Sequence, residues 1–161
     1  MRLPDNKLIT NVTNLLENYR NRKLKLATAE SCTGGMISSL ITEISGSSDV
    51  FECGFVTYSN ESKINLLGVD GEIIEKYGAV SEQTAIAMAL GAINRTRADI
   101  AVSVTGIAGP SGGSKEKPVG LVYIATAKKD GTNCIKNIFT GSRHEIRLKT
   151  VIKSIEIMSV I

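Results

Sequence analysis

The chain has 161 residues, of which 42% are hydrophobic and 22% charged, with a formal net charge of +3. These values are ordinary for a soluble globular protein, and the length suits a single domain over residues 1–161 with its own hydrophobic core. Lysine and arginine are spread along the chain and only 4% of residues are aromatic, so we expect no nucleic-acid partner.

Three cysteines, Cys32, Cys53 and Cys134, are present, and no two of them form a C-x-x-C pair. An odd number without such a pair argues against a disulfide framework or a zinc site and predicts a reducing, cytoplasmic setting. The lone histidine, His144, cannot build a metal cluster by itself. The polar N-terminus predicts no signal peptide, and no apolar run approaches the roughly 18 residues that span a bilayer.

The first half of the chain predicts helices alternating with strands. Apolar residues three and four apart predict a helix within residues 5–23, capped by Asp5 or Asn6. A short strand over 24–30 follows, and then a helix over 34–45 that ends at Gly46. The β-rich run 50–60 predicts a second strand. Two brief helices come next, over 62–69 with a stop at Gly68 and over 70–78.

The second half predicts one long helix and then a mainly β region. The helix includes residues 84–93, and the apolar, β-branched run 99–106 predicts a central strand buried on both faces. A glycine- and proline-rich loop spans 107–120. Strands over 119–129 and 133–141 are joined at Asp-Gly-Thr as a hairpin, and an amphipathic helix covers 142–161. The fold class is therefore α/β, a three-layer α/β/α sandwich with a mixed, mostly parallel sheet.

Three polar clusters lie at the ends of predicted strands, over residues 30–35, 58–63 and 105–110. In open α/β sheets, binding sites gather on the loops beyond the strand ends, where helix N-termini present free N–H groups. If these strands are neighbours, the three clusters converge. The sequence therefore predicts a site at this edge of the sheet.

The first cluster, in "TAESCTGG", offers two nucleophiles beside a turn. Ser31 or Cys32 can attack a carbonyl, or the stretch can simply cap the next helix. Glu30 fits a general base, or an acid that stabilises the positive end of that helix. The Gly34-Gly35 pair would expose backbone N–H groups that suit an oxyanion.

A serine nucleophile needs a base, and His144 lies outside the three clusters. The available arrangement is Ser–Lys, with Lys63 from the second cluster as the base. Lys63 must then be neutral part of the time, which burial or a nearby cation would allow. Tyr58 can relay or donate a proton. The alternatives are an exposed lysine and an ordinary strand aromatic.

Five segments taken together carry a family resemblance. They are "TAESCTGG", "GFVTYSNESKINLLGV", "GAVSEQTA", "VSVTGIAGPSGGSKEKPVGLVYIA" and "TGSRHEIR". In this order they resemble the CinA C-terminal-domain family, which includes stand-alone nicotinamide-nucleotide amidohydrolases of the PncC type. The resemblance runs from about Asp5 to Ser159. The additional N-terminal domain of longer members has no counterpart in this sequence.

The resemblance implies hydrolysis of the carboxamide of nicotinamide mononucleotide (NMN) to nicotinic acid mononucleotide and ammonia. The implied mechanism is independent of metals and cofactors and uses Ser31, Tyr58 and Lys63. Dimerisation is frequent in the family, so we expect a homodimer or a larger homo-oligomer. The expected substrate-binding residues are Thr33, Gly34 and Gly35 as oxyanion donors, Thr105, Gly106 and Gly109 in the ligand-contacting loop, and Arg143 and Arg147, one of which is expected to contact the phosphate.

Two positions depart from the family pattern: Ser142 stands where aspartate is usual, and Ile146 where valine is usual. Two other functions stay open at this point. In one, Cys32 is the nucleophile of a thiol amidase. In the other, the chain is a nucleotide-binding regulatory module without turnover.

Overall fold

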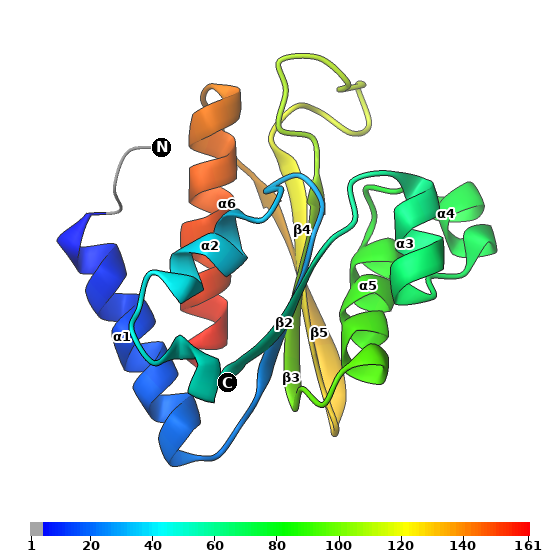
Figure 1. Cartoon of the computed structure of the whole chain (residues 1–161). Helices are drawn as coiled ribbons and strands as arrows, with labels where there is room; N and C mark the ends of the chain where they lie inside the picture. Colours follow the sequence, from blue (N-terminus) through cyan, green and yellow to red (C-terminus); the bar gives the residue numbers. More distant parts are fainter. Residues whose placement is uncertain (1–4) are drawn as a thin grey trace.

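The computed structural model describes residues 5–161 (Figure 1). Three strands are separated by helices in the first two-thirds of these residues, and a β-hairpin and a final helix follow. The elements are α1 (Asn6–Asn21), β1 (Leu26–Glu30), α2 (Met36–Thr42), the 3-10 helix η1 (Ser47–Asp49), β2 (Phe51–Val56), α3 (Asn60–Leu67), α4 (Gly71–Tyr77), α5 (Glu82–Arg95), β3 (Ile100–Gly106), β4 (Leu121–Lys128), β5 (Gly131–Ile138) and α6 (Arg143–Met158).

The sheet has five strands in the order β2-β1-β3-β4-β5. The β1–β2 and β1–β3 pairs are parallel, whereas β3–β4 and β4–β5 are antiparallel. Two strand pairs are therefore parallel and two are antiparallel, although four of the five strands run in the same direction. The predicted mixed sheet is confirmed. The predicted central strand is also confirmed: β3 lies in the middle and is buried over Ile100–Thr105.

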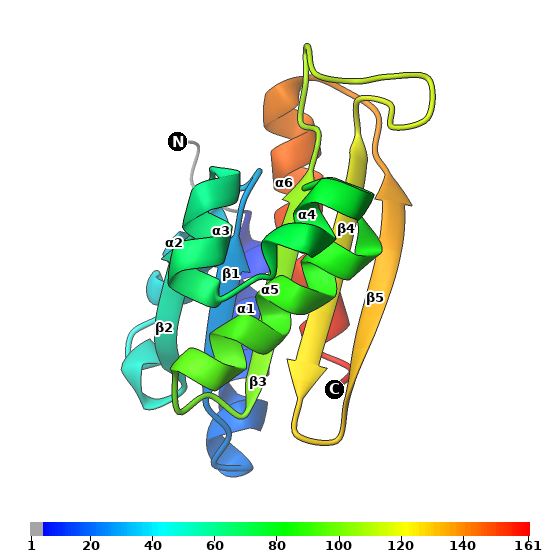
Figure 2. The same cartoon turned by 90° about the vertical axis from the view of Figure 1, so that its right-hand side faces the viewer.

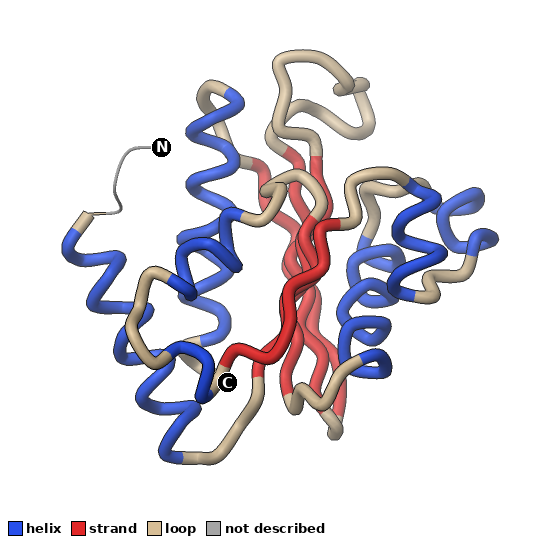
Figure 3. The backbone as a smooth tube through the Cα atoms, viewed as in Figure 1, coloured by secondary structure: helices blue, strands red, loops and turns tan. Residues whose placement is uncertain are grey.

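Helices cover both faces of the sheet and complete the predicted three layers (Figures 1, 2 and 3). Helices α1, α2 and α6 lie on one face, and α3, α4 and α5 on the other. Successive residues of β1 point to opposite faces: Leu26 packs in the core beneath α1 and α6, and Ala27 packs in the core beneath α5. None of the helices over residues 5–161 is long and apolar enough to cross a membrane.

Several element boundaries differ by a few residues from the sequence prediction, and those of α2 and of the hairpin are described here. Helix α2 covers only Met36–Thr42, because Gly34 and Gly35 have φ angles of 60° and 93° and so form a left-handed turn outside the helix. In the hairpin, Lys128 pairs with Gly131, so the turn is two residues long rather than Asp-Gly-Thr.

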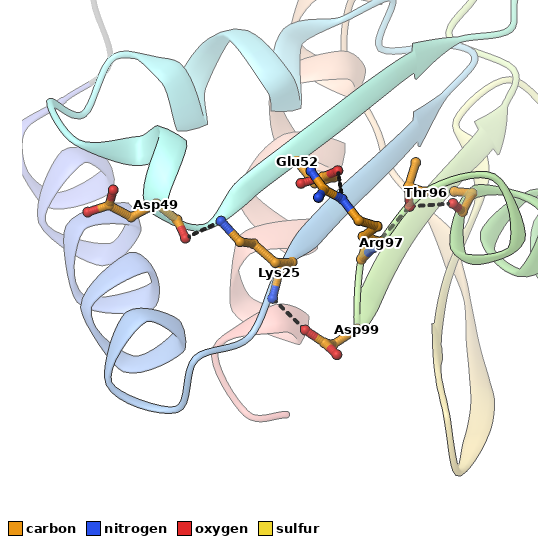
Figure 4. A network of polar contacts seen from close by, with 8 residues as sticks. Lys25, Asp49, Glu52, Thr96, Arg97 and Asp99 are labelled. Carbon is orange, nitrogen blue, oxygen red and sulfur yellow. Dashed lines mark hydrogen bonds and ion pairs between the residues drawn. The ribbon is translucent and has the colours of Figure 1, made fainter.

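A polar network ties the elements together at the edge where β1, β2 and β3 begin (Figure 4). Lys25 donates through its backbone N–H to Asp99 and through its Nζ to the Asp49 carbonyl, at 2.8 Å each. Arg97 contacts Glu52 at 3.2 Å. These contacts hold the strand starts in register, and the opposite edge, where the same strands end, carries the predicted polar clusters.

Candidate active site

A cavity of about 230 Å³ opens where β1, β2 and β3 end. Its lining comes from all three polar clusters, so the predicted convergence is confirmed. Of the expected site residues it contains Ser31, Tyr58, Lys63, Thr105, Gly106 and Arg143, and it adds Cys32, Asn60, Ala79, Val80 and Ala108. The lining does not include the other expected substrate-binding residues, which are Thr33, Gly34, Gly35, Gly109 and Arg147.

Lys63 and Ser31 are in direct contact at the base of this cavity. The parallel pairing of β1 with β2 brings residue 57 beside residue 30, and α3 then carries Lys63 back over the end of β1. The Lys63 Nζ is 3.2 Å from the Ser31 Oγ and donates to the Thr57 carbonyl at 2.9 Å. The expected nucleophile and the expected base therefore lie within hydrogen-bond reach of each other.

Lys63 is almost completely buried, with 1% of its surface exposed. Burial lowers the pKa of its amine below the usual value of 10.5, because an apolar surrounding disfavours the charged form. No carboxylate forms an ion pair with Lys63 among residues 5–161. The environment therefore shifts the equilibrium towards the neutral amine, which is the form that can accept a proton.

Glu30, the last residue of β1, has no exposed surface and folds back over the start of α2. Its carboxylate accepts five hydrogen bonds, which come from the backbone N–H groups of Gly35, Ile37 and Ser38 and from the hydroxyls of Thr33 and Ser38, at 2.7–3.0 Å. Glu30 therefore stabilises the positive end of α2 and holds the turn that carries Ser31. Its carboxylate is fully occupied, which leaves it no base role in the cavity.

The same contacts change the expected oxyanion donors. The Gly35 N–H donates to Glu30, and the Gly34 N–H donates to the Ser31 carbonyl at 3.0 Å. Both N–H groups are therefore engaged within the turn. The Thr33 N–H has no hydrogen-bond partner within the described part of the chain.

Cys32 also lines the cavity, but its thiol is in an unreactive state. The side chain is 6% exposed, and burial raises its pKa to about 11. A thiol with that pKa is almost entirely protonated at neutral pH, whereas the thiolate is the nucleophilic form. The geometry and the protonation state therefore both favour Ser31 over Cys32 as the nucleophile.

Tyr58 and Arg143 meet at the mouth of the cavity. The Arg143 Nη2 donates to the Tyr58 hydroxyl at 2.9 Å, and its Nη1 donates to the Gly109 carbonyl at 2.8 Å. Tyr58 makes no hydrogen bond to Ser31 or Lys63 in the described residues. Arg143 thus joins the second cluster to the loop after β3 and places a positive charge beside the cavity.

The second expected arginine points elsewhere. Arg147 donates from Nε to the Cys32 carbonyl at 3.1 Å and from Nη2 to the Thr33 carbonyl at 2.7 Å. Its guanidinium therefore braces the turn that carries Ser31. Ser142, the departure from the family pattern, caps α6 in a reciprocal arrangement with Glu145, so the helix that carries both arginines still begins with a complete cap.

The remaining lining residues shape the cavity wall. The Thr105 hydroxyl donates to the Ala79 carbonyl at 2.7 Å, which joins the end of β3 to the segment before α5. Ala79 and Val80 belong to the quoted "GAVSEQTA" segment, and Asn60 belongs to the second polar cluster, so their positions were signalled although they were not singled out. No three His, Cys, Asp or Glu side chains in residues 5–161 are grouped as metal ligands would be.

Comparison with known proteins identifies relatives for almost the whole chain. The model of a family described as the CinA C-terminal domain matches residues 7–160. A solved structure described as the competence/damage inducible protein CihA from Agrobacterium tumefaciens has a TM-score of 0.95 and 46% identity, and the match covers 99% of this chain and 98% of that chain.

Two curated relatives differ in length. A protein named nicotinamide-nucleotide amidohydrolase PncC, from Enterobacter agglomerans, is 54% identical over 129 residues, which are 80% of this chain and 79% of that protein. A putative competence-damage inducible protein from Caldicellulosiruptor bescii is 53% identical over 129 residues, but these are only 31% of its length. The chain thus spans about a third of the longer relatives and most of the shorter one.

Proposed function

The chain belongs to the CinA C-terminal domain family, and from this premise we propose that it hydrolyses the carboxamide of NMN to nicotinic acid mononucleotide and ammonia. The observation that carries the proposal is the contact between the buried Lys63 amine and the Ser31 hydroxyl at 3.2 Å. The name of the PncC relative supports the choice of substrate.

Acylation begins with neutral Lys63. Its Nζ accepts the Ser31 proton as the Oγ attacks the carboxamide carbon, and the C=O electron pair moves to the oxygen. The direct contact needs no relay, so the tyrosine relay is not required for this step. The Lys63 ammonium then gives its proton to the leaving nitrogen, the C–N bond breaks, and ammonia departs from an ester on Ser31.

Deacylation reverses the roles. Lys63, neutral again, accepts a proton from water as the water oxygen attacks the ester carbon. The ester bond breaks, the proton returns to the Ser31 Oγ, and the carboxylate product leaves. One water is consumed, and the products are one carboxylic acid and one ammonia. Tyr58 lines the same cavity and stays a predicted catalytic residue, which contacts the substrate from the cavity mouth.

The size and charge of the cavity suit this substrate. A volume of about 230 Å³ lies below the roughly 300–1,000 Å³ of pockets that enclose a whole drug-sized ligand. We therefore place the nicotinamide ring inside and the ribose phosphate at the mouth. There the Arg143 guanidinium, with its planar set of donors, is suited to a phosphate.

The two other functions are less consistent with the site. A thiol amidase needs an ionised Cys32, and the pKa of that thiol is about 11. A module that only binds nucleotides gains nothing from burying a lysine against a serine, because burial disfavours the charge of an ammonium. Perturbed titratable groups of this kind gather at catalytic sites.

Ammonia release from NMN tests the proposal. The purified chain should release one ammonia per NMN consumed, and Ser31→Ala should abolish release while still binding NMN in a calorimetric titration. Nicotinamide without its ribose phosphate should be a poor substrate. Wild-type protein that binds NMN without releasing ammonia would instead favour the binding module, and equal turnover of nicotinamide would contradict the placement of the phosphate.

A further inference from the structure

Arg143, the first residue of α6, bridges two parts of the cavity mouth. Its Nη2 donates to the Tyr58 hydroxyl at 2.9 Å, and its Nη1 donates to the Gly109 carbonyl at 2.8 Å. It forms no ion pair with a carboxylate within residues 5–161. A guanidinium has five N–H donors, of which these contacts use two, so three remain for a ligand.

The backbone of Tyr58 is fixed on both sides, whereas its side chain is not. Thr57, just before it, donates its N–H to the Glu30 carbonyl at 2.8 Å, and Ser59, just after it, begins α3 with a reciprocal cap. The Tyr58 side chain is 61% exposed, and within residues 5–161 its hydroxyl makes no hydrogen bond other than the one from Arg143. The orientation of the phenol therefore depends on Arg143.

Arg143 is itself held at both ends. The reciprocal cap between Ser142 and Glu145 sets its backbone at the start of α6. At the other end, the Gly109 carbonyl accepts from the guanidinium. Gly109 is absent from the cavity lining, so its contact with Arg143 gives this loop residue a place in the site without contact to the substrate.

The contact with Arg143 also decides how the Tyr58 hydroxyl can act on a ligand. A guanidinium has no acceptor, so the Tyr58 oxygen accepts and its own hydrogen points away from Arg143. Tyr58 therefore meets a ligand as a donor. Both residues line the same cavity as Ser31, and the group that we place inside is the nicotinamide. Its carboxamide oxygen is an acceptor, on which negative charge develops when Ser31 attacks.

We propose that Arg143 is a positioning residue that orients the Tyr58 hydroxyl as a hydrogen-bond donor to the carboxamide oxygen. This inference rests on the proposed function and deepens it, because the same guanidinium keeps three N–H donors for the phosphate. One side chain then joins recognition of the phosphate to the reacting amide, so that Arg143 contributes to turnover as well as to binding.

A substrate that lacks only the phosphate separates these two contributions. For nicotinamide riboside, a residue that only binds phosphate has no effect on kcat/KM, whereas a residue that positions Tyr58 does. Loss of a direct donor costs about 10²–10³-fold in rate, so Tyr58→Phe should lower kcat/KM for the riboside by about a hundredfold. Arg143→Ala keeps the hydroxyl but frees its orientation, so we expect a decrease of about threefold to tenfold.

A double variant tests whether Arg143 acts through Tyr58. Two residues that act as a unit have effects that do not add, whereas independent residues have effects that do. If the only role of Arg143 toward the amide is to orient the Tyr58 hydroxyl, that role disappears with the hydroxyl. In the Tyr58→Phe background, Arg143→Ala should therefore change kcat/KM for the riboside by less than about twofold.

The test compares wild type, both single variants, the double variant, Arg143→Lys and Lys149→Ala. Lys149 is the matched control, because it lies on the same helix and donates to a backbone carbonyl, that of Thr140, outside the site. Ammonia release is measured with NMN and with the riboside. The rate at which a fluorophosphonate labels Ser31 is a second readout. Labelling forms an Oγ–P bond, releases fluoride and a proton, and offers a phosphoryl oxygen to Tyr58 in place of the carboxamide oxygen.

Arg143→Lys separates charge from geometry. An ammonium keeps the positive charge for the phosphate, but as a point donor it cannot reproduce the planar fork that spans Tyr58 and Gly109. We expect Arg143→Lys to recover most of the KM for NMN that Arg143→Ala loses, while kcat/KM for the riboside stays low. Lys149→Ala should match wild type with both substrates. Tyr58 and Arg143 are exposed, so all variants should fold.

Three outcomes would overturn the inference. Wild-type kcat/KM for the riboside in Arg143→Ala would limit Arg143 to the phosphate. Additive losses in the double variant would mean that it does not act through Tyr58. Full recovery of the riboside rate in Arg143→Lys would assign the effect to charge alone. If the riboside reacts too slowly to measure, Ser31 labelling carries the same comparisons.

Failure of the proposed function gives a different result. If wild type releases no ammonia from NMN, but Ser31 labelling falls in both single variants and no further in the double variant, the proposed function fails and the positioning role stands. If labelling is also unchanged in Arg143→Ala, both are wrong.

Discussion

Replacing Lys63 with methionine tests the proposed base most directly. Methionine fills nearly the same volume and removes only the amine, which contacts the Ser31 Oγ and the Thr57 carbonyl. The Thr57 carbonyl then loses a donor, at a cost of about 1–3 kcal/mol. Removal of a buried amine whose charge is disfavoured offsets part of that cost, so Lys63→Met should fold.

The size of the kinetic effect follows from the burial. Loss of a general base costs about 10²–10⁴-fold in rate, or about 3–5 kcal/mol. Lys63 is 1% exposed, and the methionine side chain would occupy its place, so water cannot enter to act as a substitute base. We therefore expect the upper part of the range, about 10³-fold or more in kcat, with KM changed little.

The pH dependence gives an independent measurement. Wild-type kcat/KM should rise with pH as Lys63 loses its proton, with an apparent pKa below 10.5. Stability should follow the same group: between the lowered folded pKa and the unfolded value of about 10.4, the unfolded chain binds more protons. The free energy of unfolding therefore rises with pH in that window and is lowest below the folded pKa. Lys63→Met should lose this rise.

Ammonia release by stopped assay over the pH range and urea unfolding at matched pH values measure both effects. The Lys149→Ala variant serves as the control, since its lysine is exposed and outside the site. Near-normal kcat in folded Lys63→Met, or a wild-type rate that does not change with pH, would refute the role of Lys63 as base.

The other predictions follow from the same contacts. Arg143→Ala should raise KM for NMN by about tenfold or more with a smaller change in kcat; an unchanged KM in steady-state kinetics would move the phosphate elsewhere. Cys32→Ala should keep turnover within about threefold of wild type, because the thiol is protonated; complete loss of ammonia release in the folded variant would restore the thiol amidase. Glu30→Gln should lower the free energy of unfolding by about 3 kcal/mol or more, because one of its two carboxylate oxygens becomes an NH₂ that faces backbone N–H groups; an unchanged urea midpoint would mean that the carboxylate does not hold the turn.

Much of the fold follows from local patterns in the sequence. Apolar spacing, β-branched runs and glycine stops together located every helix from α1 to α6 and every strand of the sheet. The same patterns put Ser31 just beyond the end of a strand, Thr105 in the last residues of another, and Lys63 on the helix that follows a third. The predicted helix boundaries were wrong by a few residues where a single backbone angle sets the boundary. At Gly35, for example, a φ of 93° delays the start of α2.

The chemistry of the site was also partly available before the fold. A serine without a histidine in its cluster needs another base, and Lys63 was the candidate that the sequence offered. The tertiary structure decided the rest: that Lys63 is buried, that Glu30 takes up the N–H groups of the turn, and that Arg143 lines the cavity while Arg147 braces the turn from outside. A sequence records which positions are apolar or polar along the chain. It does not record which donor meets which acceptor across 32 or 115 positions, because those partners are chosen by strand order and helix packing.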